Sequence, residues 1–91
     1  MTDVLKQVKI CNKKGLHARA AACFVKQAEK YDAEIWVEKD TQRVGADSIM
    51  GLMMLAASCG NEIKIMARGA DAEQAVEALA SLVQNRFGEA E

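Results

Sequence analysis

The residues of this chain best suited to chemistry are a histidine and an arginine two positions apart, His17 and Arg19. His17 is the only histidine among 91 residues, and it lies where a strand-like apolar run gives way to a helical pattern. No Ser, Thr, Asp or Asn occurs between Lys13 and Ala22 to cap that helix. We therefore expect its first backbone N–H groups, those of Ala18 and Arg19, to lack side-chain partners.

This combination of groups favours the uptake of a phosphoryl group. Free N–H groups at the start of a helix bind anions. The same helix end disfavours an imidazolium ion, so we expect His17 to be neutral and nucleophilic near pH 7. Arg19 supplies a planar, permanently charged fork that suits phosphate oxygens. An isolated histidine in a strand–helix turn is more often an ordinary surface residue, so the prediction needs a second observation.

A second stretch with an unusual pattern is Asp47-Ser48-Ile49-Met50-Gly51-Leu52-Met53-Met54-Leu55. Ser48 is a favourable N-cap, and the apolar side chains wrap most of the way around the helix that follows. So small a domain should leave some of them exposed, and unbranched methionines suit a surface that accepts several partners. Leu52, Leu55 and Ala56 are predicted to be core. The plainer alternative is a well-buried helix with a serine that only caps it.

The two stretches resemble motifs of one known family. Gly15-Leu16-His17-Ala18-Arg19 is similar to the active-site motif of HPr, the histidine phosphocarrier of the bacterial phosphotransferase system. The stretch from Asp47 to Leu55 is similar to the regulatory serine helix of that family, at the family's spacing, and the resemblance runs over essentially the whole chain. Ala20 departs from the pattern, because proline usually follows the arginine.

The resemblance implies a carrier and not an autonomous enzyme. His17 would take a phosphoryl group on Nδ1 from an enzyme I-type donor and pass it to a IIA-type acceptor. Arg19 and the backbone N–H groups of Ala18 and Arg19 would hold the phosphoryl oxygens. Ser48 would be a regulatory site for an HPr kinase/phosphorylase. The implied docking residues are Ile49, Met50 and Met53. No metal or cofactor is expected, and the sugar-transport and nitrogen-regulatory branches both stay open.

Two functions of other classes also stay open. One is a small hydrolase of phosphate esters or acyl phosphates that uses His17 and Arg19, disfavoured because no carboxylate is expected near His17 to position water. The other is an interaction module in which only the second helix binds. Positive charge around His17 is expected from Lys13, Lys14, Arg19 and Lys26, as a rim that steers acidic partners.

Composition limits the class of protein. A length of 91 residues predicts one domain, 1–91, and a net charge of −1 argues against a nucleic-acid groove. No apolar run approaches the roughly 20 residues of a membrane span, and the N-terminus lacks signal-peptide features, so we expect a cytoplasmic monomer. The three cysteines, Cys11, Cys23 and Cys59, lack paired spacing and are predicted to be reduced, mostly buried thiols.

Hydrophobic periodicity predicts seven elements. Strands are expected at 4–11, 34–39, 43–46 and 62–67, and helices at 18–30, 48–58 and from a capping box at Asp71 to about 87. The resemblance implies an α+β, HPr-like open-faced β-sandwich of order β-α-β-β-α-β-α, in which three helices cover one face of a four-stranded antiparallel sheet. The pattern supports this layering but leaves the strand order open. Residues 89–91 are predicted to fray.

Overall fold

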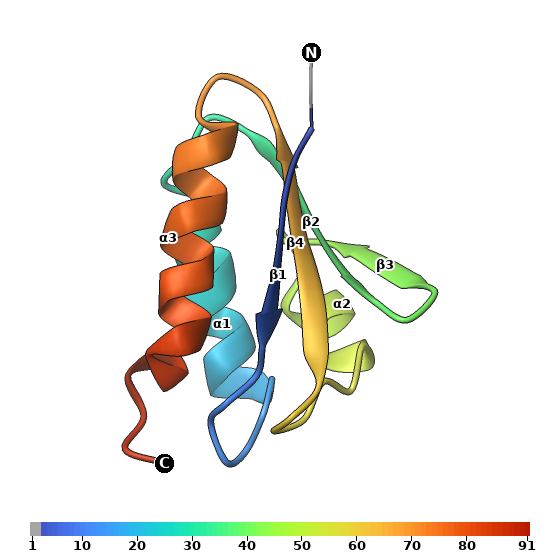
Figure 1. The fold of residues 1–91 in the computed structure, drawn as a ribbon, viewed down its shortest axis with the longest axis vertical. Coiled ribbons are helices and arrows are strands. Elements are labelled where there is room, and N and C mark those ends of the chain that lie inside the picture. The colour runs from blue at the N-terminus through green and yellow to red at the C-terminus, as the bar shows by residue number, and fades with distance from the viewer. Residues whose placement is uncertain (1–2) are drawn as a thin grey trace.

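The computed structural model describes residues 3–91, so the first two residues of the predicted domain lie outside it. Its elements are β1 (Val4–Lys9), α1 (Ala18–Ala28), β2 (Glu34–Lys39), β3 (Gln42–Gly45), α2 (Ile49–Met54), β4 (Glu62–Arg68) and α3 (Ala72–Gln84), followed by a 3₁₀ turn, Arg86–Gly88. The strands form one antiparallel sheet in the order β1-β4-β2-β3 (Figure 1). The predicted α+β sandwich and its element order are therefore confirmed.

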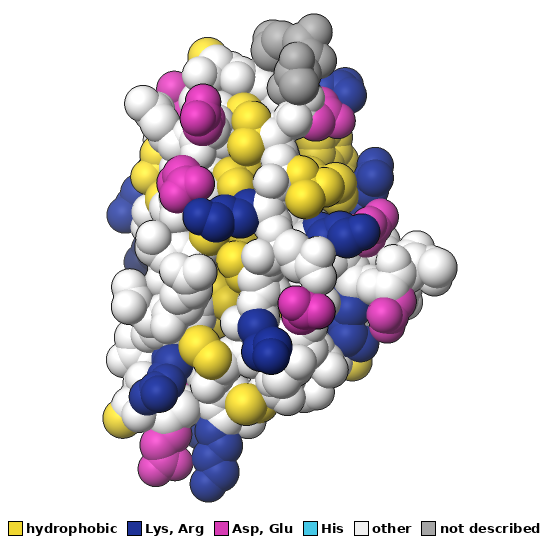
Figure 2. Space-filling view, viewed as in Figure 1, with side chains coloured by type: hydrophobic (Ala, Val, Ile, Leu, Met, Phe, Trp, Pro, Cys, Tyr) yellow, Lys and Arg dark blue, Asp and Glu magenta, His cyan; other side chains and the backbone are white. Residues whose placement is uncertain are grey.

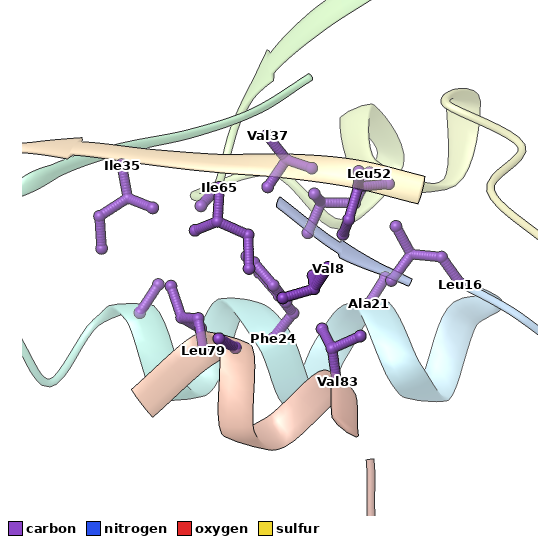
Figure 3. Close-up of a cluster of buried hydrophobic side chains, with 14 of the residues drawn as sticks. Val8, Leu16, Ala21, Phe24, Ile35, Val37, Leu52, Ile65, Leu79 and Val83 are labelled. Atoms are coloured by element: carbon purple, nitrogen blue, oxygen red, sulfur yellow. The ribbon is translucent and has the colours of Figure 1, made fainter. Parts of the chain in front are cut away.

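The core forms because alternate strand residues face the helices. Val8 pairs with Ile63 across β1 and β4, and Val37 pairs with Ile65 across β2 and β4. All four side chains are buried. They meet apolar residues of α1 and α3, among them Phe24 and Leu79 (Figure 3). Burying each such side chain contributes on the order of 1.5–3 kcal/mol of favourable free energy, which holds α1 and α3 against the sheet.

A close contact joins the chain before α1 to the chain after α2. Gly15 has φ +67°, and a Cβ on it would lie 2.5 Å from the carbonyl oxygen of Ala57 and 2.8 Å from Cα of Ser58. The N–H of Leu16 donates to that same oxygen over 2.8 Å. Glycine is required here both for its backbone conformation and for its lack of a side chain. The contact holds the residue before His17 in place.

Helix α2 is shorter than predicted. It ends at Met54, and Ala56 adopts a left-handed conformation with φ +52°. Because the chain turns there, Leu55 and Ala57 point into the core while Ala56 is exposed. The prediction that Ala56 is core was therefore wrong, and so was the predicted helix end near residue 58. Gly60 lies in the turn before β4, where its N–H donates to the carbonyl of Ile10.

Two further local predictions were wrong. Asp71 precedes α3, but its side chain does not cap that helix; it accepts the N–H of Asp32 over 2.8 Å, which ties the β2 side of the fold to the start of α3. The cysteines are free but not mostly buried: Cys11 and Cys59 are exposed and Cys23 is partly buried. Cys11 follows the buried Ile10 just beyond the end of β1, and its Sγ donates to the carbonyl oxygen of Val83 over 3.4 Å.

The surface agrees with the near-neutral composition. Figure 2 shows Lys and Arg interspersed with Asp and Glu over the face that carries α3, β1 and β4, with no basic stripe on that face. Among the helices of residues 3–91, none is long and apolar enough to cross a membrane.

Candidate functional site

His17 is the N-cap residue of α1. Its backbone is extended, with φ −80° and ψ −178°, and its carbonyl accepts the first helical hydrogen bond, from the N–H of Ala21 over 2.8 Å. Its side chain makes no capping hydrogen bond. Within the described chain, the N–H groups of Ala18, Arg19 and Ala20 have no hydrogen-bond acceptor. The expected uncapped helix start is confirmed, and it presents a positive end beside the imidazole.

The loop before His17 is held by Asn12. This residue is fully buried, and its Nδ2 donates to the carbonyl of Gly15 over 2.8 Å. The same Nδ2 donates to Oε1 of Glu89 over 2.9 Å. The buried amide therefore joins the loop before His17 to the C-terminal tail. Asn12 could not be recognised from the sequence, because only its position in the fold gives it these partners.

The most unexpected neighbour of His17 is the carboxylate of Glu89. Its Oε2 lies 2.6 Å from Nε2 of His17 and 2.9 Å from Nη1 of Arg19. The Glu89 side chain is only 13% exposed, against 27% for His17 and 60% for Arg19. Two predictions were therefore wrong: Glu89 is not part of a frayed tail, and His17 does not lack a nearby carboxylate. The contacts of Glu89 with His17 and Arg19 span about 70 residues of sequence, so no local sequence pattern predicts them.

The environment of Glu89 favours its ionised form. Burial opposes ionisation, but the hydrogen bonds from Asn12, His17 and Arg19 outweigh it and lower the pKa of the Glu89 carboxyl below its ordinary value. An ionised carboxylate has acceptor atoms only. All three contacts are therefore donated to Glu89, and the tail carries a negative charge at the site.

The charge around the site differs in part from the expected rim. An open hollow is lined by Lys13, Lys14, His17 and Arg19, together with residues 88–91. Lys26 does not belong to it, because it lies in the last turn of α1, at the opposite end of the helix from His17. The Lys13 ammonium lies 3.7 Å from the Glu91 carboxylate, and both side chains are well exposed. The site thus combines basic side chains with the acidic tail.

Helix α2 presents an apolar surface. Ser48 caps it, accepting the N–H of Gly51 on Oγ over 2.9 Å. A Cβ on Gly51 would lie 3.2 Å from that oxygen and 3.4 Å from Cβ of Val44, so the glycine allows Ser48 and Val44 to lie close to the helix backbone. Leu52 and Leu55 are buried as predicted. The large apolar residues exposed on this helix are Ile49 (40%), Met50 (70%), Met53 (39%) and Met54 (70%).

Met54 was missed as a candidate docking residue. It lies four positions after Met50 and therefore on the same side of the helix, which is the signal that could have found it. We call these four exposed residues of α2 the apolar patch. Helix α1, whose N-cap is His17, packs against α2, so the patch and the histidine belong to neighbouring elements. No group of three potential metal-ligating side chains occurs among residues 3–91.

Comparison with known proteins agrees with this site. A family model described as the PTS HPr component phosphorylation site matches residues 4–85. Phosphocarrier protein HPr of Neisseria meningitidis is 48% identical, with 97% of this chain and 100% of that protein covered. Phosphocarrier protein NPr of Shewanella violacea is 42% identical, with 99% of each covered.

A solved structure extends the similarity to three dimensions. The crystal structure of HPr-C-His from Thermoanaerobacter tengcongensis superposes with a TM-score of 0.90 at 49% identity, and both chains are covered completely. The sequence motifs, the fold and the near-complete coverage agree. The chain belongs to the HPr family of phosphocarrier proteins of the phosphotransferase system.

Proposed function

We propose that this protein carries a phosphoryl group on His17, received from an enzyme I-type phosphohistidine and passed to a IIA-type acceptor. The observation that supports this most directly is the start of α1. There the imidazole stands beside three backbone N–H groups without acceptors in the described chain, and beside the Arg19 guanidinium. Phosphoryl transfer needs mainly positioning and charge stabilisation, which such a site supplies.

Arg19 keeps donors for the phosphoryl oxygens despite its contact with Glu89. A guanidinium has five N–H donors, and only Nη1 of Arg19 donates to Glu89. With 60% of its side chain exposed, Arg19 can turn its remaining donors towards an incoming phosphoryl group. The N–H groups of Ala18 and Arg19 would hold the other oxygens. A site this open can release the group to the next protein.

The apolar patch of α2 is the proposed docking surface for donor and acceptor. Ile49, Met50 and Met53, together with Met54, expose apolar area beside the element that bears His17. Flexible methionines can pack against partners of different shape. We expect the carrier to act as a monomer, which the mass in solution would test.

Ser48 is the proposed regulatory residue. A phosphate on it would lie at the N-terminal end of α2 and would add about −1.5 to −2 charges beside the apolar patch. The fold should tolerate this charge, because it lies at the positive end of the helix, whereas docking of an anionic partner site should weaken. An HPr kinase/phosphorylase is the expected modifying enzyme, and phosphorylation of Ser48→Ala under the same conditions is the control.

The test of the proposed function is incubation with an enzyme I-type donor and phosphoenolpyruvate. The wild type should gain one acid-labile phosphate, and His17→Ala should gain none while keeping its fold. Labelling of His17→Ala at the wild-type rate would exclude His17 as the acceptor. Hydrolysis was disfavoured because no carboxylate was expected near His17 to position water, and Glu89 is such a carboxylate. Free phosphate is therefore measured as well. Its steady release from phosphate esters would favour hydrolysis over carriage.

A further inference from the structure

The contact with Glu89 determines which nitrogen of the His17 ring carries the proton. Glu89 is ionised in this environment and can only accept hydrogen bonds, so the 2.6 Å contact must be a donation from Nε2–H. A neutral imidazole carries one ring proton, and Nδ1 therefore keeps a free lone pair. Within the described chain, Nδ1 makes no hydrogen bond. The nucleophilic atom is thus determined by a residue of the C-terminal tail.

The tail is anchored so that Glu89 is held in this place. Phe87, two residues earlier, is buried in the core with φ +54°, and the turn it forms redirects the chain after α3. The second carboxylate oxygen of Glu89 accepts from the buried amide of Asn12. Three donors and a buried aromatic anchor restrict the carboxylate far more than an ordinary surface ion pair.

We infer that Glu89 is a positioning residue for phosphoryl transfer: by accepting Nε2–H it holds the His17 ring and leaves Nδ1 as the attacking nitrogen. This inference rests on the proposed function. The Nδ1 lone pair forms the new N–P bond while the N–P bond of the donor breaks, and that electron pair returns to the donor's imidazole. No proton moves. The His17 ring gains positive charge and keeps its Nε2 proton, and the adjacent carboxylate stabilises that charge, as the aspartate does in a Ser-His-Asp triad.

The structure offers a matched set of variants for the test. Glu89→Gln keeps the shape but removes the charge, and Glu89→Ala removes the contact altogether. Glu77→Gln is the control, because it also removes one negative charge, at an exposed residue of α3 that lies 3.2 Å from Lys6 and outside the hollow around His17. Amide NMR spectra and melting curves of the full-length proteins establish that each variant is folded.

The first readout is made on the unphosphorylated protein and needs no donor. In the wild type and in Glu77→Gln, the Nε2–H proton of His17 should be protected from exchange with water and visible at low field in NMR spectra at neutral pH. In Glu89→Ala it should exchange too fast to observe. A purely structural role for Glu89 would leave this signal unchanged, and the same signal in the wild type and in Glu89→Ala would overturn the inference.

The second readout is kcat/KM for phosphorylation by an enzyme I-type donor with phosphoenolpyruvate. Outer-shell partners of metal-bound histidines contribute about 10–100-fold, and by analogy we expect a loss of about that size in Glu89→Ala and Glu89→Gln. Glu77→Gln should remain within about twofold of the wild type. Unchanged or faster transfer in both Glu89 variants would overturn the inference; faster transfer would mean that Glu89 competes with the phosphoryl group for Arg19. If the wild type accepted no phosphate, the proposed function and this role would fall, while the NMR signal would still report the hydrogen bond.

Discussion

Replacing Gly15 by alanine perturbs the contact that holds the His17 loop against the chain after α2. The backbone of Gly15 is left-handed, which costs an L-residue about 1–2 kcal/mol. The new Cβ would also lie 2.5 Å from the Ala57 carbonyl oxygen, a distance that forces the two segments apart. Their separation breaks the hydrogen bond from Leu16 to that oxygen, worth about 0.5–1.5 kcal/mol. The summed loss in free energy of unfolding is about 1.5–3.5 kcal/mol.

Gly60→Ala is the matched control. Gly60 also has a positive φ, +94°, but a Cβ there would meet no atom within 4 Å. It should therefore lose only the conformational cost of about 1–2 kcal/mol. The two variants should differ by about 0.5–1.5 kcal/mol, and for a domain of this size Gly15→Ala should melt about 2–12 °C below Gly60→Ala.

The two assays are thermal unfolding followed by circular dichroism and phosphorylation by an enzyme I-type donor. Gly15→Ala should also transfer phosphate more slowly, because the segment that leads into His17 has moved. Gly60→Ala should transfer at the wild-type rate. Equal melting temperatures for the two variants would refute the reasoning, since they would show that the close approach of Gly15 to Ala57 contributes nothing.

Three further predictions follow from the site and its surroundings. Arg19→Lys should slow phosphorylation much more than it lowers the melting temperature, because lysine keeps the charge but cannot make a bidentate contact with the phosphate. Equal phosphorylation rates for the wild type and this variant would exclude the guanidinium as a phosphate ligand. Met50→Glu should weaken binding to donor and acceptor in titrations with little loss of stability, since Met50 is 70% exposed. Leu55→Ala, in contrast, should lower the free energy of unfolding by about 2–5 kcal/mol and leave binding intact. The reverse result for the two variants would mean that the helix is oriented differently. The lowered pKa of Glu89 stabilises the fold fully above the ordinary carboxyl pKa of about 4.3, and this stability is lost as the pH falls through the lowered value. Wild type and Glu89→Gln should therefore differ in unfolding free energy at pH 7 and converge once the pH has fallen through that lowered pKa.

The uncapped helix start at His17 could be predicted because the relevant signals are local. His17 and Arg19 lie within about one helical turn of each other, and no capping residue occurs near them. An uncapped helix start therefore follows from residue types alone. Ser48 as the cap of α2 is local for the same reason. The alternating pattern of the predicted strand 34–39 likewise agrees with the burial of Ile35 and Val37, since side chains of a strand point alternately to its two faces.

The exposed surface of α2 was only partly predictable. The pattern showed more apolar residues than one core could take, and Met50 is indeed 70% exposed. Yet Met54 was missed and Ala56 was placed in the core, because the helix was expected to continue to about residue 58. Packing of Leu55 and Ala57 into the core ends it at Met54, through a left-handed Ala56. A helix end imposed by tertiary packing has no signature in local propensity.

What the sequence determined by itself was therefore the set of elements, the uncapped helix start that carries His17 and Arg19, and the cap at Ser48, all of which depend on neighbours a few positions away. Only the tertiary structure decided that β4 lies between β1 and β2, because strand order is a matter of long-range pairing. It also decided that Glu89 lies 2.6 Å from His17. That contact exists because α3 packs against the sheet and the buried Phe87 turns the tail back towards α1, and such a contact follows from the packing of the whole domain.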